Sequence, residues 1–139
     1  MNRVFIASNI PMYAAGAGHP RVEPARRVVT AVAAGEIDAV TDAEVLQEIL
    51  YRYMHISQTE KGFEVFDLFF RLMAGRILPI EDQDVRQARE LAVRYPTLSA
   101  RDLVHLAVML RHKIEEIVTA DADFDAVAEV RRRDPGTFT

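Results

Sequence analysis

The sequence predicts an α/β fold: a three-layer α/β/α sandwich built on a mostly parallel sheet of about five strands. Short apolar runs rich in β-branched residues alternate along the 139 residues with longer segments whose apolar residues recur at helical spacing. A helix between consecutive strands requires a crossover, which makes the strands parallel and places helices on both faces of the sheet. No repeat, linker or low-complexity tract interrupts this alternation, so we expect one domain over residues 1–139.

The first part of the chain predicts a strand, a helix and a second strand. Residues 3–6 (RVFI) form a short apolar run that is typical of a strand. A turn-rich loop precedes a helix at about 23–34, which tolerates Pro24 in its first turn. Gly35 suits the end of this helix, and residues 37–41 (IDAVT) form the second strand.

Two helices follow directly. Asp42 can cap the first, which carries an apolar stripe, and the second spans about 59–74, ends at Gly75 and is rich in phenylalanine. The phenylalanines suit a core, but they exceed what one buried stripe needs, so a partner groove or dimer face is an alternative. The apolar residues are Val45, Leu46, Ile49, Leu50 and Tyr53 in the first helix, and Phe63, Phe66, Phe69, Phe70, Leu72 and Met73 in the second.

The remaining elements alternate in the same way. Val85, Ala88 and Leu91 make one helix amphipathic, and Ser99 caps another that is apolar nearly all round. The expected elements are a strand at 76–80, a helix at 81–94, a helix at about 99–112, a strand at 115–120, a turn or short helix at 123–128 and an edge strand at 129–134.

Composition limits the classes of function. With no cysteine, the chain can form no disulfide, thiolate metal site or cysteine nucleophile, which fits a reducing cytoplasm. No apolar run approaches the roughly 20 residues that span a bilayer, so we expect a soluble protein with no membrane partner. The formal net charge of −4 argues against a protein that holds nucleic acid mainly through phosphate contacts. It does not exclude a nuclease, because bound metal reverses the local charge of an acidic site.

Acidic residues that are far apart in the chain lie at the edges of apolar runs. Glu48 lies in the helix after the second predicted strand, Asp102 in the first turn of a buried helix, and Asp121 directly after the fourth strand. The carboxyl ends of parallel strands share one edge of the sheet, where functional sites of such folds lie. Carboxylates that meet there repel one another unless a cation joins them, so the sequence predicts a site for a hard divalent cation.

Glu48 and Asp102 each have a structural interpretation as well. Glu48 lies four residues from both Glu44 and Arg52, the spacing of surface ion pairs on a helix, and this alternative is the stronger one for Glu48 alone. Asp102 stands three residues after Ser99, as the acid of a capping box does.

Three alternating acids after the fourth strand, Asp121, Asp123 and Asp125, are spaced like the ligands of a calcium loop. An EF-hand needs glycine at its sixth position and glutamate at its twelfth. This chain has Ala126 and Arg132 there, so we reject that motif. We expect Asp121 to lie nearest the strand end and Asp125 to be solvated.

Other catalytic motifs are weak or absent in the sequence. Gly16 and Gly18 lack the third glycine of a dinucleotide fingerprint, and no P-loop occurs. Ser8 has no evident base beside it. His105 and His112 could share a helix face, but without a third clustered ligand we expect them to be packing or surface histidines.

Four segments occur in an order and at a spacing that are together fairly specific: VFIASNIPMY, VTDAEVLQEILYRY, LSARDLVHLAVML and IVTADADF. They are similar to the opening, the two acid-bearing helices and the Thr-x-Asp-x-x-Phe ending of PIN-domain ribonucleases of the VapC toxin type, which belong to type II toxin–antitoxin systems. The resemblance covers nearly the whole chain. It places the acids at Glu48, Asp102 and Asp121, with Asp123 auxiliary, and Ala7 stands where the family carries its first aspartate.

The resemblance implies a three-layer PIN-like fold and a Mg²⁺- or Mn²⁺-dependent endoribonuclease toxin of the cytoplasm. Such a toxin hydrolyses RNA phosphodiester bonds, is neutralised by a VapB-like antitoxin and forms a homodimer. Asp102 and Asp121 would hold the metal, Glu48 would bind it or orient water, and Asp123 would assist.

The resemblance also implies supporting roles and one departure. Ser8 and Asn9 would position the first ligand or a phosphate oxygen, and Arg101 would steer the RNA backbone. A methyl group cannot coordinate a cation, so Ala7 would leave this chain inactive or impaired. The alternative function is a non-catalytic PIN-like module that binds a partner protein through the helix around residues 63–70.

Overall fold

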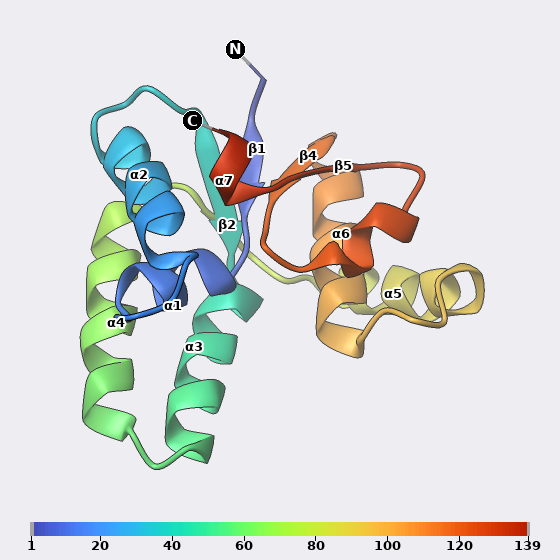
Figure 1. The fold of residues 1–139 in the computed structure, drawn as a ribbon. Coiled ribbons are helices and arrows are strands. Elements are labelled where there is room, and N and C mark those ends of the chain that lie inside the picture. Colours follow the sequence, from blue (N-terminus) through green and yellow to red (C-terminus); the bar gives the residue numbers. More distant parts are fainter. Residues whose placement is uncertain (1, 139) are drawn as a thin grey trace.

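A five-stranded sheet lies at the centre of the molecule (Figure 1). The computed structural model describes residues 2–138. The strands are ordered β3-β2-β1-β4-β5, so the chain starts in the middle, builds one half outward and then crosses back to build the other. Every pairing is parallel; Phe5 lies opposite Val40 on one side and Ile117 on the other. The strands are β1 (Val4–Ile6), β2 (Ala39–Asp42), β3 (Ile77–Leu78), β4 (Glu116–Val118) and β5 (Arg131–Arg133).

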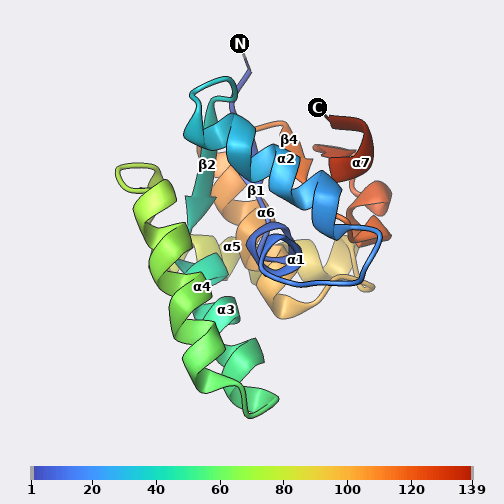
Figure 2. The ribbon, with the colours of Figure 1, turned by 60° about the vertical axis from the view of Figure 1, so that its left-hand side comes forward.

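Helices cover both faces of this sheet and confirm the three-layer α/β/α prediction (Figures 1 and 2). One face carries α1 and α2 and the other carries α5 and α6, while α3 and α4 pack together and extend beyond the strands. Among residues 2–138, no helix has the length and apolar character needed to cross a membrane. The helices are α1 (Asn9–Ala14), α2 (Val22–Ala33), α3 (Ala43–His55), α4 (Thr59–Leu72), α5 (Asp82–Arg94), α6 (Ala100–Arg111), the 3₁₀ turn η1 (Ala122–Ala126) and α7 (Pro135–Phe138).

Local sequence signals place most of these elements correctly. Gly35 and Gly75 follow α2 and α4 at φ angles of 74° and 80°, as predicted for glycines that end helices. The six-residue helix α1 and the four-residue α7 were not predicted, because segments so short contain too little periodicity. The third strand has two residues rather than five, since Pro79 has no N–H to continue the ladder.

The core lies on both faces of the two central strands. Phe5 and Ile117 are fully buried, and α6 packs across them with Leu106 and Met109 equally inaccessible. Because α6 is enclosed on nearly all sides, its sequence is apolar nearly all round, as predicted. This burial fixes the N-terminal end of α6 beside the carboxyl ends of the strands.

The phenylalanine-rich helix α4 is only partly a core element. Val65 and Phe69 face inward, whereas Phe63, Leu68 and Phe70 have 51%, 62% and 48% of their surface exposed. Leu68 and Phe69 also line an apolar groove of about 440 Å³ formed with residues of α1 and α2. The alternative of a partner surface on α4 therefore has a physical basis.

A buried acid joins α5 to α6 away from the strand ends. Asp84 accepts hydrogen bonds from Arg111 Nε at 2.8 Å, from Arg111 Nη2 at 2.9 Å and from the Glu81 backbone N–H at 2.9 Å. Burial acts to raise the pKa of Asp84, but these hydrogen bonds outweigh it and hold the pKa below its usual value. Asp84 and Arg111 thus form a structural ion pair.

Candidate active site

The carboxyl ends of β1, β2 and β4 meet at one edge of the sheet. β1 and β4 flank the point where strand order reverses, the usual place for a functional crevice in open parallel sheets. Ala7 follows β1, Asp42 ends β2, and the segment 119–121 follows β4. α3 and α6 begin at the same edge and bring Glu48 and Asp102 to it.

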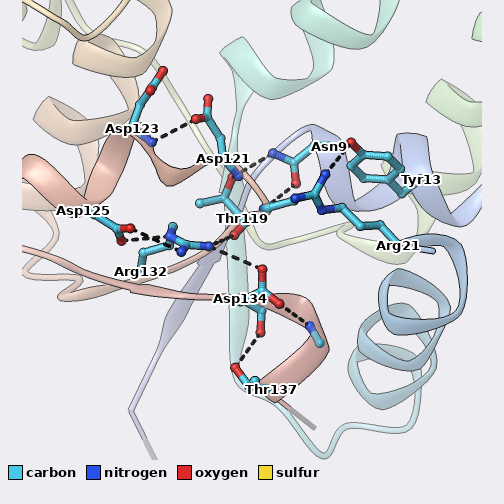
Figure 3. Close-up of polar contacts among 12 residues, drawn as sticks. Asn9, Tyr13, Arg21, Thr119, Asp121, Asp123, Asp125, Arg132, Asp134 and Thr137 are labelled. Atoms are coloured by element: carbon cyan, nitrogen blue, oxygen red, sulfur yellow. Dashed lines mark hydrogen bonds and ion pairs between the residues drawn. The ribbon is translucent and has the colours of Figure 1, made fainter. Parts of the chain in front are cut away.

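Three carboxylates converge there. Asp102, Asp121 and Asp123 each offer an oxygen, and the three oxygens lie within 4.8 Å of one another. Asp102 comes from the first turn of α6, where its N–H donates to Ser99 Oγ at 3.2 Å, and the other two come from the start of η1. Asp121 Oδ1 accepts the N–H of Asp123 at 2.9 Å, which caps that turn (Figure 3). Ser99 therefore caps α6 as predicted, but within residues 2–138 the reciprocal bond from the Ser99 N–H to Asp102 that completes a capping box is not observed, and the Asp102 carboxylate belongs to the acidic cluster.

The loop that carries Asp121 is held from the start of α1. Asn9 Nδ2 donates to Thr119 Oγ1 at 2.7 Å, and Asn9 Oδ1 accepts the Ala120 N–H at 3.1 Å (Figure 3). Thr119 Oγ1 in turn accepts the N–H of Asp121 at 3.1 Å. Asn9 therefore supports the turn that presents Asp121, over a sequence distance of 110 residues.

Glu48 makes contacts that its local sequence does not suggest. Its Oε2 accepts a hydrogen bond from Ser8 Oγ at 3.1 Å, and its Oε1 contacts His105 Nε2. Among residues 2–138, Glu48 forms no ion pair with Arg52, so the surface-pair alternative is not observed. Glu48 does not belong to the group of three converging carboxylates, but it lies near enough to raise the pKa of Asp102.

His105 is the residue whose role the sequence did not reveal. It is only 3% exposed, and its Nδ1 lies 2.8 Å from Asp42 Oδ2 while its Nε2 contacts Glu48. Two carboxylates on the two ring nitrogens require both nitrogens to donate, which makes the ring an imidazolium. Burial acts to lower the pKa of His105, but the hydrogen bonds and charges of Asp42 and Glu48 outweigh it and raise the pKa to about 10.

Asp42 connects this pair to the sheet. It is fully buried at the end of β2, and its Oδ1 accepts the Val45 N–H at 2.9 Å, which caps α3 as predicted. Its Oδ2 is then free to bind His105, 63 residues away. A helix-capping acid and a histidine three residues after Asp102 were visible in the sequence, but nothing local indicated that they meet.

Crowding of acids marks the site electrostatically. The pKa of Asp102 is raised to about 6, chiefly by burial and further by Asp121 and Glu48, although His105 opposes the shift. The pKa of Glu44, one turn before Glu48, is also raised, first by burial and then by neighbouring carboxylates. Carboxylates that raise one another's pKa favour a bound cation.

Ala7 contributes no ligand atom. Its N–H donates to the Val118 carbonyl at 3.1 Å, so the residue lies beside the end of β4, and its side chain is nearly buried. The two residues that follow it, Ser8 and Asn9, support Glu48 and the Asp121 loop respectively. Position 7 therefore lies within the site, although the methyl group of Ala7 has no atom that could coordinate a cation.

Asp125 lies outside the cluster. Its carboxylate forms an ion pair with Arg132 Nε at 2.8 Å, so it is paired rather than merely solvated (Figure 3). Arg101 directly precedes Asp102 in α6, and its guanidinium carbon stands 4.0 Å from the ring centroid of Tyr51. It lines a recess that also includes Glu48.

The donor set fits a hard divalent cation. Carboxylate oxygens are the ligands that Mg²⁺ and Mn²⁺ prefer, and three of them already lie within 4.8 Å of one another. Asp102, Asp121 and Asp123 are the residues that could hold such an ion. Glu48 is turned toward Ser8 and His105, which suits a group that orients water beside the ion.

Comparisons with known proteins point to one family. The PIN domain family matches residues 4–130. Ribonuclease VapC13 of Mycobacterium tuberculosis is 43% identical over 129 residues, which cover 93% of this chain and 98% of that protein. The crystal structure of Mycobacterium tuberculosis VapC20, a sarcin-ricin loop cleaving toxin, superimposes with a TM-score of 0.74 at 23% identity over 91% of this chain and 96% of that one. A DNA-bound VapBC complex from Salmonella typhimurium gives a TM-score of 0.72 at 16% identity, covering 97% and 99%.

Proposed function

The chain belongs to the PIN-domain family and is of the VapC type, and from that premise we propose that its ancestral activity is metal-dependent endoribonuclease hydrolysis of RNA. The observation that carries the proposal is the convergence of Asp102, Asp121 and Asp123 at the strand ends. The relatives are named as ribonucleases, and a carboxylate cluster of this kind suits that chemistry.

Each residue of the site has a part in this proposal. Asp102, Asp121 and Asp123 hold Mg²⁺ or Mn²⁺. A bound divalent cation lowers the pKa of attacking water and neutralises charge that develops on the phosphoryl oxygens. Glu48, fixed by Ser8 and His105, orients that water or completes the ligand set.

We further propose that Ala7 weakens the metal binding and the RNA cleavage of this chain. A carboxylate at position 7 would stand beside the end of β4 and add a further oxygen ligand to a cluster that has three. Without it, the metal binds more weakly and the phosphodiester is held less precisely. The other acids and their hydrogen-bonded supports are intact, so one substitution restores the full set.

The test is the substitution Ala7→Asp, assayed with Mg²⁺ on transfer, ribosomal and messenger RNA. We expect cleavage to rise by at least about 100-fold, equivalent to about 3 kcal/mol of transition-state stabilisation. Ala7→Asn is the matched control, because it adds nearly the same volume without the anionic ligand, and we expect little gain. A complete lack of cleavage of every RNA class by Ala7→Asp, with Mn²⁺ demonstrably bound, contradicts the proposal.

We further propose a VapB-like antitoxin as protein partner and a homodimer as the native state. The fold neighbour from Salmonella typhimurium is a VapBC complex, and the family resemblance implies both associations. Light scattering measures the subunit number, and co-expression with the product of an adjacent small gene tests the antitoxin. A monomer at all concentrations contradicts the homodimer, and failure of that product to bind contradicts the antitoxin.

A second candidate function is a non-catalytic binding module. The exposed side chains Phe63, Leu68 and Phe70 on α4 favour it, because apolar surfaces of this kind mark protein contacts. The double variant Asp102→Ala, Asp121→Ala separates the two candidates. Unchanged cellular function with tight partner binding supports the module, and loss of function with binding retained supports the nuclease.

A further inference from the structure

A recess opens beside the acidic cluster on the side of α3. It has a volume of about 470 Å³, within the roughly 300–1,000 Å³ of sites that bind small ligands. Asn9 and Glu48, both part of the site described above, are among its lining residues. The recess therefore adjoins the residues that flank the acidic cluster, because Asn9 holds the Asp121 loop and Arg101 precedes Asp102 in α6. The remaining lining residues are Met12, Tyr13, Arg52, Tyr53, Ile56 and Arg101.

Two guanidinium groups in the recess are available to bind an anion. Within residues 2–138, neither Arg52 nor Arg101 has a carboxylate oxygen within 4.0 Å. Arg52 has the helical spacing to pair with Glu48, but Glu48 is turned away toward Ser8 and His105. The contacts that fix Glu48 thus leave Arg52 unneutralised beside an acidic site, in a chain of net charge −4.

Arg101 is held in position by an aromatic ring. Its guanidinium carbon lies 4.0 Å from the centroid of Tyr51, and that ring stacks in turn on His55 with an interplanar angle of 5°. A guanidinium held against a ring keeps its in-plane N–H groups free to donate, and their fork matches two phosphate oxygens. Arg101 is therefore oriented before any ligand arrives.

Part of the lining of the recess is aromatic and apolar. Tyr13 is half-buried, and Arg21 Nη1 donates to its hydroxyl at 3.5 Å (Figure 3). The His19 ring lies 4.9 Å from the Tyr13 ring, centroid to centroid, which further restricts its orientation. Met12 and Ile56 supply the apolar remainder, with Ile56 42% exposed. Arg21 also stands over the Tyr13 ring, with its guanidinium carbon 5.8 Å from the centroid, so a flat ring system can rest on the part of this surface that Arg21 and His19 leave uncovered.

From this arrangement we infer that the recess is a subsite for one unpaired nucleotide next to the scissile phosphodiester. Its phosphate binds Arg52 and Arg101, and its base packs against Tyr13, Met12 and Ile56. The occupant is single-stranded, because a base within a duplex is stacked and cannot turn into a pocket. The inference rests on the proposed function, since it assigns part of the RNA to a surface beside the cluster.

The experiment measures binding of a short fluorescein-labelled single-stranded RNA by anisotropy, in Mg²⁺. It uses the chain with Ala7 in place, which by the proposal cleaves the RNA too slowly to consume it. We expect Arg52→Ala and Arg101→Ala each to weaken binding about 5- to 10-fold. Each should also reduce the slope of log K against log salt by roughly 0.7, the value for one phosphate contact to a single strand. Arg89→Ala is the matched control, because it removes the same charge from an exposed position on α5, and we expect almost no change.

A second pair of variants tests the base contact. Tyr13→Ala should weaken binding about 5-fold or more with the salt slope unchanged, because stacking involves no counterion release. Tyr13→Phe retains the ring and should bind nearly as the parent does. Circular dichroism and thermal unfolding confirm that each variant is folded.

The outcomes separate the subsite from the proposed function. If Arg89→Ala weakens binding as much as Arg52→Ala and Arg101→Ala do, the RNA is held by overall charge and the subsite is wrong. If RNA binds, and Ala7→Asp cleaves it, but none of the recess variants changes affinity, the subsite is again wrong while the nuclease proposal stands. If the parent binds no RNA and Ala7→Asp cleaves none, both are overturned.

Discussion

Replacing His105 by leucine should destabilise the protein more than any other conservative change in the site. His105 is 3% exposed between Asp42, which is fully buried, and Glu48, whose side chain is 16% exposed. Leucine fills similar space but leaves two carboxylates without their shared cation. Removing one partner from a buried ion pair costs about 3–5 kcal/mol. The two carboxylates also hold the pKa of His105 above its usual value, which is the direction expected if the imidazolium stabilises the folded state.

The same contact predicts a pH dependence of stability. The pKa of His105 is higher in the folded than in the unfolded chain. The stability that protonated His105 contributes to the folded state is therefore fully present below pH 6.5 and is lost as pH rises through about 10. The difference in unfolding free energy between the parent and His105→Leu should therefore be largest near pH 6 and should narrow steadily toward pH 10.

Urea unfolding followed by far-ultraviolet circular dichroism, repeated across this pH range, measures both effects. His112→Leu is the matched control, because the Nε2 of His112 is buried without a hydrogen-bond partner and its loss should cost little. If His105→Leu costs less than about 1 kcal/mol, or if its cost does not change with pH, then His105 is not a buried imidazolium held by two carboxylates.

Two further substitutions test the scaffold that positions the site. Asp84→Asn removes the buried partner of Arg111 and should cost about 1.5–3 kcal/mol at pH 7, measured by urea unfolding, because it weakens hydrogen bonds to a charged group that stays partly exposed. Because the pKa of Asp84 is lowered in the folded state, its contribution is present above about pH 4 and lost as pH falls further, so the deficit of the variant should shrink in acid. Gly62→Ala places a Cβ 2.5 Å from the Tyr53 Cβ, where α4 packs on α3. We therefore expect the free energy of unfolding to fall by about 1–3 kcal/mol, despite the better helix propensity of alanine. A higher melting temperature would contradict that close approach.

Local signals carried most of the fold prediction. The cap at Ser99, the apolar sequence of α6 and the glycine after α4 are each decided by neighbours within a few residues, so the sequence alone places these elements. The strand Val4–Ile6 was also clear, because a buried parallel strand is apolar throughout. The helix α1 was not, since six residues and one proline display no period.

The site was only partly predictable, because it depends on contacts between residues far apart in the sequence. The convergence of Asp102 and Asp121 could be predicted, because Asp102 opens a buried helix and Asp121 follows a buried strand, and both positions lie at the strand ends. Glu48 has a local pattern that favours a surface pair with Arg52, and a contact with His105, 57 residues away, overrides it. Long-range contacts of this kind depend on how α3 and α6 pack, which no local pattern records.

Titration with Mn²⁺, followed by electron paramagnetic resonance, tests most directly whether the distant acids form one metal site. We predict a bound Mn²⁺ whose dissociation constant rises at least about 10-fold in Asp102→Asn and in Asp121→Asn, because each loses an anionic ligand. Asp125→Asn is the matched control, since Asp125 pairs with Arg132 instead, and its affinity should equal that of the parent. Equal affinity in all three variants, or no binding by the parent, would contradict a shared cation at the strand ends.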